Sequence, residues 1–195
     1  MSNLPNKFKV TQEIEGIEVL TPVETDNKYS IWDEEGNEFL YAYEKSGFIG
    51  KQFLGDKRSL NLHILDINGK EIFSLKRPFY ILKSKAKILM GDGTPFGSLI
   101  QKIKVAGTHF DFISPNGQIV FSVNSTVLHP WTFKVSMNGE QVAQISKKWQ
   151  GFVKESVTDA DNFEVDVTNI QDDSIKYAIL ITTLLIDLST FEKRS

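Results

Sequence analysis

The sequence predicts a mainly β protein, a closed antiparallel barrel of about twelve strands that encloses a C-terminal hydrophobic α-helix. Three observations support this fold class. Short segments that alternate apolar and polar residues recur along the chain, separated by glycine-containing turns. The chain then closes on a stretch with little charge, "IKYAILITTLLIDLSTFEKRS". Finally, 195 residues with 41% hydrophobic and 24% charged side chains suffice for one domain with a sizeable core.

Five β-hairpins are expected in chain order, each with apolar alternation on both sides of a turn. Their sequences are "YSIWDEEGNEFLYAYE", "LNLHILDINGKEIFSL", "KILMGDGTPFGSLIQKI", "HFDFISPNGQIVFSV" and "TFKVSMNGEQVAQI". The turns fall at Gly36, Asn68-Gly69, Gly91 and Gly93, Asn116-Gly117, and Asn138-Gly139. Asn-Gly and Asp-Gly tolerate the positive φ angles of tight hairpin turns, and the flanks are rich in strand-forming residues.

Two further strands complete the count, "GIEVLTP" before the hairpins and "NFEVDVT" after them. A sheet of this size must curl or close to protect its edges. A barrel of about twelve strands is too wide for its own side chains to fill, so an apolar segment has to occupy the interior. We therefore expect a short lead-in over 1–16 and a single barrel domain over 17–195.

The C-terminal stretch is expected to be that internal segment, a helix over about 174–191. Asp172, Asp173 and Ser174 are candidate N-cap residues. The uncharged run 177–186 is about half the roughly 20 residues that span a bilayer. Asp187 would cost about 2.5–3.5 kcal/mol near a bilayer centre. The core positions are expected to be Ile179, Leu180, Leu184, Leu185 and Leu188; a bilayer-inserted helix remains the alternative.

Composition excludes several classes of function. The net charge of −3 provides no overall attraction to nucleic acid, so no nucleic-acid partner is expected. The absence of cysteine rules out disulfides, thiolate metal sites and S-palmitoylation. No secretory signal is visible at the N-terminus, so a cytoplasmic location is expected, at most peripheral at the inner face of the membrane.

Catalysis finds no support in the motifs. His63, His109 and His129 are isolated from one another, and no metal-binding spacing joins them. The chain has neither a G-x-S-x-G elbow nor a phosphate-binding loop. We therefore expect a protein that is not an enzyme and requires no cofactor.

Several segments resemble the phospholipid scramblases, a family related to the Tubby C-terminal domain and the LURP-one-related proteins. They are "IEVLTPVETDNKYSIWDEEGNE", "LDINGKEIFSLKRPF", "ISKKWQGFVKESVTDADNFEVDV" and the end "LLIDLSTFE". The resemblance runs from about Ile17 to Glu192. It implies a twelve-stranded barrel threaded by a hydrophobic helix, and an association with Ca²⁺-dependent movement of phospholipids between leaflets. The cysteine cluster that carries palmitoyl groups in some members is missing from "FYILKSKAKILM".

The resemblance points to a Ca²⁺ site in "DADNFEVDVTNI". Asp159 and Asp161 match positions 1 and 3 of an EF-hand loop, but Phe163 and Ile170 stand where positions 5 and 12 need oxygen ligands. The same residues fit a strand preceded by an acidic turn. At most weak Ca²⁺ binding is expected here.

A second candidate site is basic and would bind anionic phospholipid head groups. It comprises Lys76, Arg77, Lys83, Lys85 and Lys87, of which the last three share one face of a strand. The alternative interpretation is a strand whose exterior is protected by lysines. The sequence thus predicts a scramblase-like protein that contacts phospholipids peripherally, with a role in transbilayer movement. The alternative is a soluble barrel that binds a ligand or an unidentified protein and moves no lipid.

Overall fold

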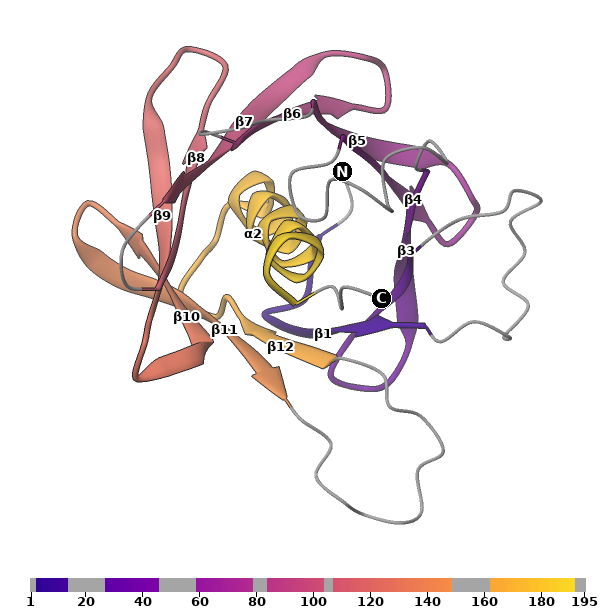
Figure 1. The fold of residues 1–195 in the computed structure, drawn as a ribbon. Helices are drawn as coiled ribbons and strands as arrows, with labels where there is room; N and C mark the ends of the chain where they lie inside the picture. Colours follow the sequence, from indigo (N-terminus) through magenta and orange to yellow (C-terminus); the bar gives the residue numbers. More distant parts are fainter. Residues whose placement is uncertain are drawn as a thin grey trace.

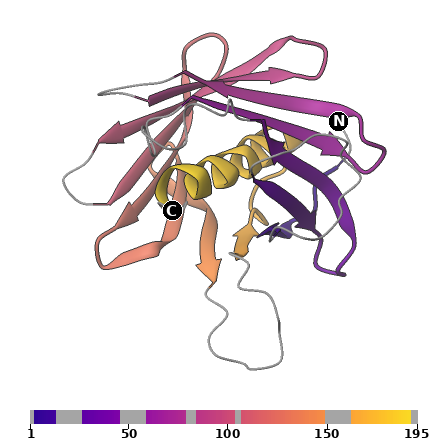
Figure 2. The same ribbon diagram turned by 45° about the vertical axis from the view of Figure 1, so that its right-hand side comes forward.

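Twelve antiparallel strands form a closed barrel in the computed structural model, which describes residues 3–13, 27–45, 59–78, 84–103, 107–148 and 162–191. Figures 1 and 2 show helix α2 enclosed by the ring of strands. The strands are β1 (Lys7–Gln12), β2 (Lys28–Trp32), β3 (Glu38–Glu44), β4 (Leu60–Asp66), β5 (Glu71–Arg77), β6 (Ser84–Met90), β7 (Pro95–Ile103), β8 (Thr108–Ile113), β9 (Ile119–Thr126), β10 (His129–Met137), β11 (Glu140–Lys148) and β12 (Asn162–Asp166). The predicted fold class is confirmed.

Each strand from β2 to β12 pairs with its neighbours in sequence, and β1 closes the ring between β2 and β12. The five predicted hairpins are β2–β3, β4–β5, β6–β7, β8–β9 and β10–β11. At the β10–β11 turn, Asn138 and Gly139 have φ angles of 51° and 87°, which explains the Asn-Gly pair.

The expected lead-in over 1–16 was wrong, because β1 lies within it. Phe8 and Val10 of β1 point into the core, while the strand pairs with β12 on one side and β2 on the other. Without this strand the barrel would have two open edges. The strand expected over 16–22 lies outside the described residues. The one expected at the start of "NFEVDVT" is β12.

The interior of the barrel is filled by α2 (Asp173–Ile186), which continues into the π-helical turn η2 (Asp187–Phe191). Every residue from Lys176 to Leu188 is buried. The expected core residues, Ile179, Leu180, Leu184, Leu185 and Leu188, are each at most 1% exposed. Asp173–Phe191 is long and apolar enough to cross a membrane, but most of it is enclosed by protein. In this structure the helix therefore serves as the core of the barrel.

Polar contacts fix where α2 begins. The Asp172 carboxylate accepts a hydrogen bond from the backbone N–H of Ser174 at 2.8 Å, so Asp172 is the N-cap. The Lys176 ammonium, although buried, donates to the carbonyl of Leu4 at 3.2 Å and to Asn6 Oδ1 at 2.9 Å. These bonds connect the start of the helix to the residues that lead into β1. Thr182 and Thr183 donate to carbonyls one turn earlier, which satisfies their hydroxyls inside the core.

Candidate functional site

The two ends of the barrel carry different charges. One end, here called the turn end, holds the five predicted hairpin turns and the start of α2. Its described acidic residues include Asp33, Glu34, Glu35, Glu38, Asp66, Glu71, Asp92, Glu140, Asp166, Asp172 and Asp173, against the lysines Lys7 and Lys70. The other end, here called the basic end, holds the β9–β10 turn and the C-terminus of α2. Lysines lie on or near its described rim: Lys28, Lys45, Lys76, Lys85, Lys102 and Lys148. The described part of the barrel is therefore electrically polar along its axis.

The basic end includes a row of exposed lysines on the outer wall of β5 and β6. Lys76 lies directly opposite Lys87 across the two strands, and Lys85 lies two residues from Lys87 on the same face. No described carboxylate forms an ion pair with these three side chains. Because like charges directly opposite each other destabilise a sheet, this placement is better suited to binding an anion than to strand pairing. Lys83 lies outside the described residues.

Arg77 does not belong to this row, contrary to the prediction. Along β5 the side chains of Phe73, Leu75 and Arg77 alternate toward the interior, and Arg77 is only 1% exposed. Its Nη1 donates to Ser189 Oγ of η2 at 2.7 Å. The guanidinium therefore belongs to the interior of the basic end and holds the end of the helix.

The interior of the basic end also contains a buried ion pair. Asp187, the first residue of η2, accepts a hydrogen bond from the Tyr29 hydroxyl at 2.8 Å and lies 3.3 Å from the Lys147 ammonium. The Lys147 ammonium lies over the rings of Phe163 and Phe191, at 5.0 and 3.9 Å from their centroids. Asp187, whose charge disfavours a bilayer-spanning helix, is thus paired with the Lys147 ammonium of the barrel wall.

Two of the three histidines lie beside carboxylates, and neither contacts another histidine in the described structure, as the sequence predicts. His63 Nδ1 lies 2.6 Å from Glu71 Oε2 on the outer wall. His109 Nε2 lies 2.8 Å from Asp111 Oδ1. The Ser122 hydroxyl donates a hydrogen bond to the same carboxylate oxygen at 2.6 Å. The serine hydroxyl donates to the carboxylate rather than to the histidine, so the group lacks the geometry of a nucleophile activated by a base.

Asp111 is the centre of this outer-wall cluster. Burial by itself would raise the pKa of the carboxyl group, but hydrogen bonds from Lys102 and Ser122, together with the nearby His109, outweigh it and lower the pKa below 3.8. The Lys102 ammonium lies 2.5 Å from Asp111 Oδ2. Lys102 is therefore already paired and contributes less free charge to the rim than Lys76 or Lys85.

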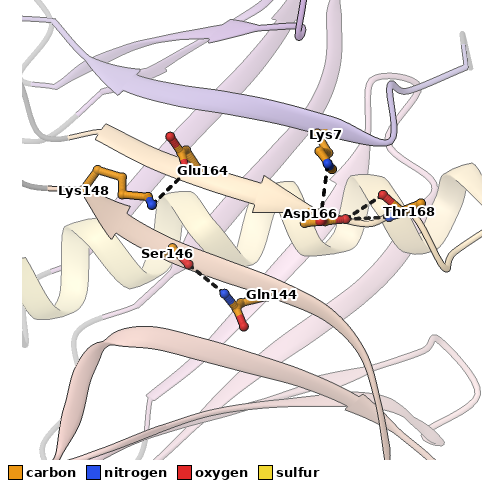
Figure 3. Close-up of polar contacts among 7 residues, drawn as sticks. All are labelled: Lys7, Gln144, Ser146, Lys148, Glu164, Asp166 and Thr168. Atoms are coloured by element: carbon orange, nitrogen blue, oxygen red, sulfur yellow. Dashed lines mark hydrogen bonds and ion pairs between the residues drawn. The ribbon is translucent and has the colours of Figure 1, made fainter.

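The opposite wall of the barrel, formed by β11, β12 and β1, provides a contrast (Figure 3). Lys148 lies 3.1 Å from Glu164, and Lys7 lies 4.0 Å from Asp166. A shallow groove of about 430 Å³ runs between these pairs. Lys9 also lines this groove, opposite Glu164 across β1 and β12. Because two of its three cations have carboxylate partners, this wall is less suited to attracting an anionic surface than β5 and β6.

The predicted Ca²⁺ ligands Asp159 and Asp161 lie outside the described residues. Phe163, which stands at position 5 of the EF-hand-like pattern and cannot serve as a ligand there, points into the core from β12. Within the described ranges, no three His, Asp or Glu side chains gather as a metal site would require. Ca²⁺ binding at 159–161 therefore stays a prediction.

Comparisons with known proteins agree with the resemblance seen in the sequence. The family model described as Scramblase matches residues 3–193. Phospholipid scramblase 1 of Rattus norvegicus is 32% identical over 202 residues, an alignment that covers 96% of this chain and 60% of that protein. Phospholipid scramblase 2 of Homo sapiens is 28% identical, with 94% and 67% covered. The chain spans about three fifths of the length of the mammalian phospholipid scramblase 1 proteins.

A solved structure of a protein from Arabidopsis thaliana has the same fold. Its TM-score is 0.53 at 16% sequence identity, and the match covers 94% of this chain and 91% of that one. The match supports the barrel architecture. At this identity it carries no information on activity.

Proposed function

Because the chain belongs to the scramblase family, we propose that it binds anionic phospholipid head groups from the aqueous side of a membrane, and that this binding is one step in the movement of phospholipids between leaflets. The observation that carries the proposal is the row of Lys76, Lys85 and Lys87 on the outer wall of β5 and β6. Each lysine near an anionic surface contributes about 1 kcal/mol of binding free energy. Three together favour binding by roughly a hundredfold.

The burial of α2 supports contact from the aqueous side. A helix enclosed by twelve strands is not available to lipid unless the barrel opens. The anionic lipids of the cytoplasmic leaflet provide the matching negative surface, so we propose a cytoplasmic, peripheral location. Movement of a head group through hydrocarbon needs a polar path, and the proposal assigns the barrel only the binding step.

The test is co-sedimentation with vesicles of phosphatidylcholine that contain or lack phosphatidylserine, over a range of salt concentrations. We expect binding only with phosphatidylserine, and a steep loss of binding from about 50 mM to about 500 mM salt. The triple variant Lys76→Ala, Lys85→Ala, Lys87→Ala should bind roughly a hundredfold more weakly.

A matched control removes the same charge from residues that lie away from the basic end. The variant Lys7→Ala, Lys9→Ala, Lys70→Ala has the same net charge as the first triple variant, but should retain most of the binding, because Lys7 and Lys70 lie at the turn end and Lys9 lies on β1 of the opposite wall. Equal losses in both variants would show that only net charge matters. Failure of the unaltered protein to bind would overturn the proposal and favour a barrel that binds a protein or another ligand.

A further inference from the structure

The β9–β10 turn consists of two apolar residues, whereas the five turns at the opposite end of the barrel are mainly polar. Thr126 pairs with His129, which leaves Val127 and Leu128 as a two-residue turn. Their exposed fractions are 66% and 86%, the two highest among the exposed large hydrophobic residues of the described chain. Turns of this length favour Asn, Asp and Gly, and Val is poorly suited to one. Local turn chemistry therefore does not explain these two residues.

The turn lies at the basic end of the barrel, where β9 finishes and β10 begins. Trp131, four residues beyond Val127, is 39% exposed and packs on Phe191 with 5.1 Å between the ring centroids. Phe191 in turn contacts the rings of Phe133 and Phe163. The apolar tip is thus mounted on an aromatic cluster that anchors it to the end of the central helix.

We propose that Val127 and Leu128 insert into the boundary between the head groups and acyl chains of an anionic bilayer, with Trp131 at the level of the head groups. Trp is favoured at that depth, and apolar side chains beside cations bind such interfaces. The inference rests on the proposed function and adds an apolar contact to the electrostatic one. It also orients the barrel, with the basic end toward the membrane and the acidic turn end away from it.

A bilayer fits this surface better than a protein partner does. A stable protein interface buries about 800 Å² on each side, far more than two exposed side chains at a hairpin tip provide. Insertion into a bilayer needs only a few apolar side chains, each of which strengthens binding by about tenfold or more. The lysines of the same rim, including Lys85 and Lys148, have the charge that complements anionic lipids.

The absence of cysteine from the chain allows a direct test. The variant L128C is labelled with an environment-sensitive nitrobenzoxadiazole dye and mixed with vesicles of phosphatidylcholine and phosphatidylserine. The control is I119C, because Ile119 is the first residue of β9, at the turn end of the barrel, and is 58% exposed. We expect a blue shift and quenching by spin-labelled lipid at position 128, and neither change at position 119.

A second pair of variants tests the energy of insertion without a label. Leu128→Ser should weaken vesicle binding by about tenfold or more, while Ile119→Ser should leave it unchanged. Both side chains are exposed, so urea unfolding midpoints should stay at the value of the unaltered protein.

Each outcome bears on one claim. If the unaltered protein binds the vesicles but the emission of the dye at position 128 does not change, the proposed insertion of the turn is wrong and the proposed function stands. Equal changes at 128 and 119 also contradict the insertion. A blue shift that grows with protein concentration without vesicles would show that a second copy covers the tip, which overturns the inference. If the unaltered protein binds no vesicles, the proposed function fails.

Discussion

The ammonium of Lys147 lies 3.3 Å from the carboxylate of Asp187, which connects the wall of the barrel to the end of the helix inside it. Both side chains are almost fully buried, with exposed fractions of 1% and 4%. Removing one partner of such a pair leaves the other charge buried without that counter-ion, which is costly in a core. The pair is therefore a sensitive probe of whether the helix is seated.

We predict that Lys147→Met lowers the free energy of unfolding by about 3–5 kcal/mol. Lys148→Ala is the matched control, because the neighbouring side chain is exposed and its pair with Glu164 should contribute at most about 1 kcal/mol. Urea unfolding followed by circular dichroism measures both. The double variant Lys147→Met, Asp187→Asn should recover part of the loss, since it also removes the buried negative charge of Asp187. Equal effects at 147 and 148 would contradict the buried pair.

A second prediction concerns acid stability. The pKa of Asp111 is lower in the folded protein than its ordinary value of 3.8, so its contribution to stability is present above that value and is lost as pH falls through the folded pKa. Asp111→Asn should therefore reduce stability near neutral pH and make it less dependent on pH between about pH 5 and about pH 2. Unfolding free energies across that range measure the effect.

The hydrogen bonds that lower this pKa can be removed one at a time. Lys102→Ala should raise the pKa of Asp111, as observed by carboxyl-carbon NMR titration, because it removes the donor that lies 2.5 Å away. Lys85→Ala is the control, since it removes a lysine from the adjacent strand that no described carboxylate pairs with. An unchanged titration in Lys102→Ala would contradict the assignment.

A third prediction concerns Ca²⁺. The sequence provides carboxylates at Asp159 and Asp161 but lacks the bidentate ligand at the end of the loop, where Ile170 stands. Isothermal titration should therefore detect no Ca²⁺ binding tighter than about 1 mM. The variant Asp159→Asn, Asp161→Asn should abolish whatever weak binding remains. Micromolar affinity would contradict this interpretation of the loop.

Local patterns predicted most of the fold. Each hairpin carried its own turn signal and period-two flanks, so all five were identified without knowledge of the tertiary structure. The uncharged run 177–186 was likewise recognisable as a buried helix. The strand β1 was missed because "KFKVTQ" lacks a hairpin partner next to it in sequence. One of its two partner strands, β12, lies more than 150 residues away in sequence.

The site was predicted less completely, because its contacts are long-range. Alternation along β6 correctly placed Lys85 and Lys87 on one exterior face. The same alternation along β5 predicts that Arg77 points inside with Phe73 and Leu75. Arg77 was instead grouped with the neighbouring lysines because of its charge. No local pattern pairs Asp187 with Lys147 or Tyr29, which are 40 and 158 residues away.

The claim that α2 is the core of a barrel is tested most directly by deleting 173–195 and measuring cooperative unfolding of the remaining chain. We expect the truncated chain to show no cooperative transition and to aggregate or stay unfolded, because twelve strands alone leave an unfilled interior. A truncated chain that remains folded and soluble, with the unfolding midpoint of the full chain, would contradict it. The helix would then be a dispensable membrane anchor.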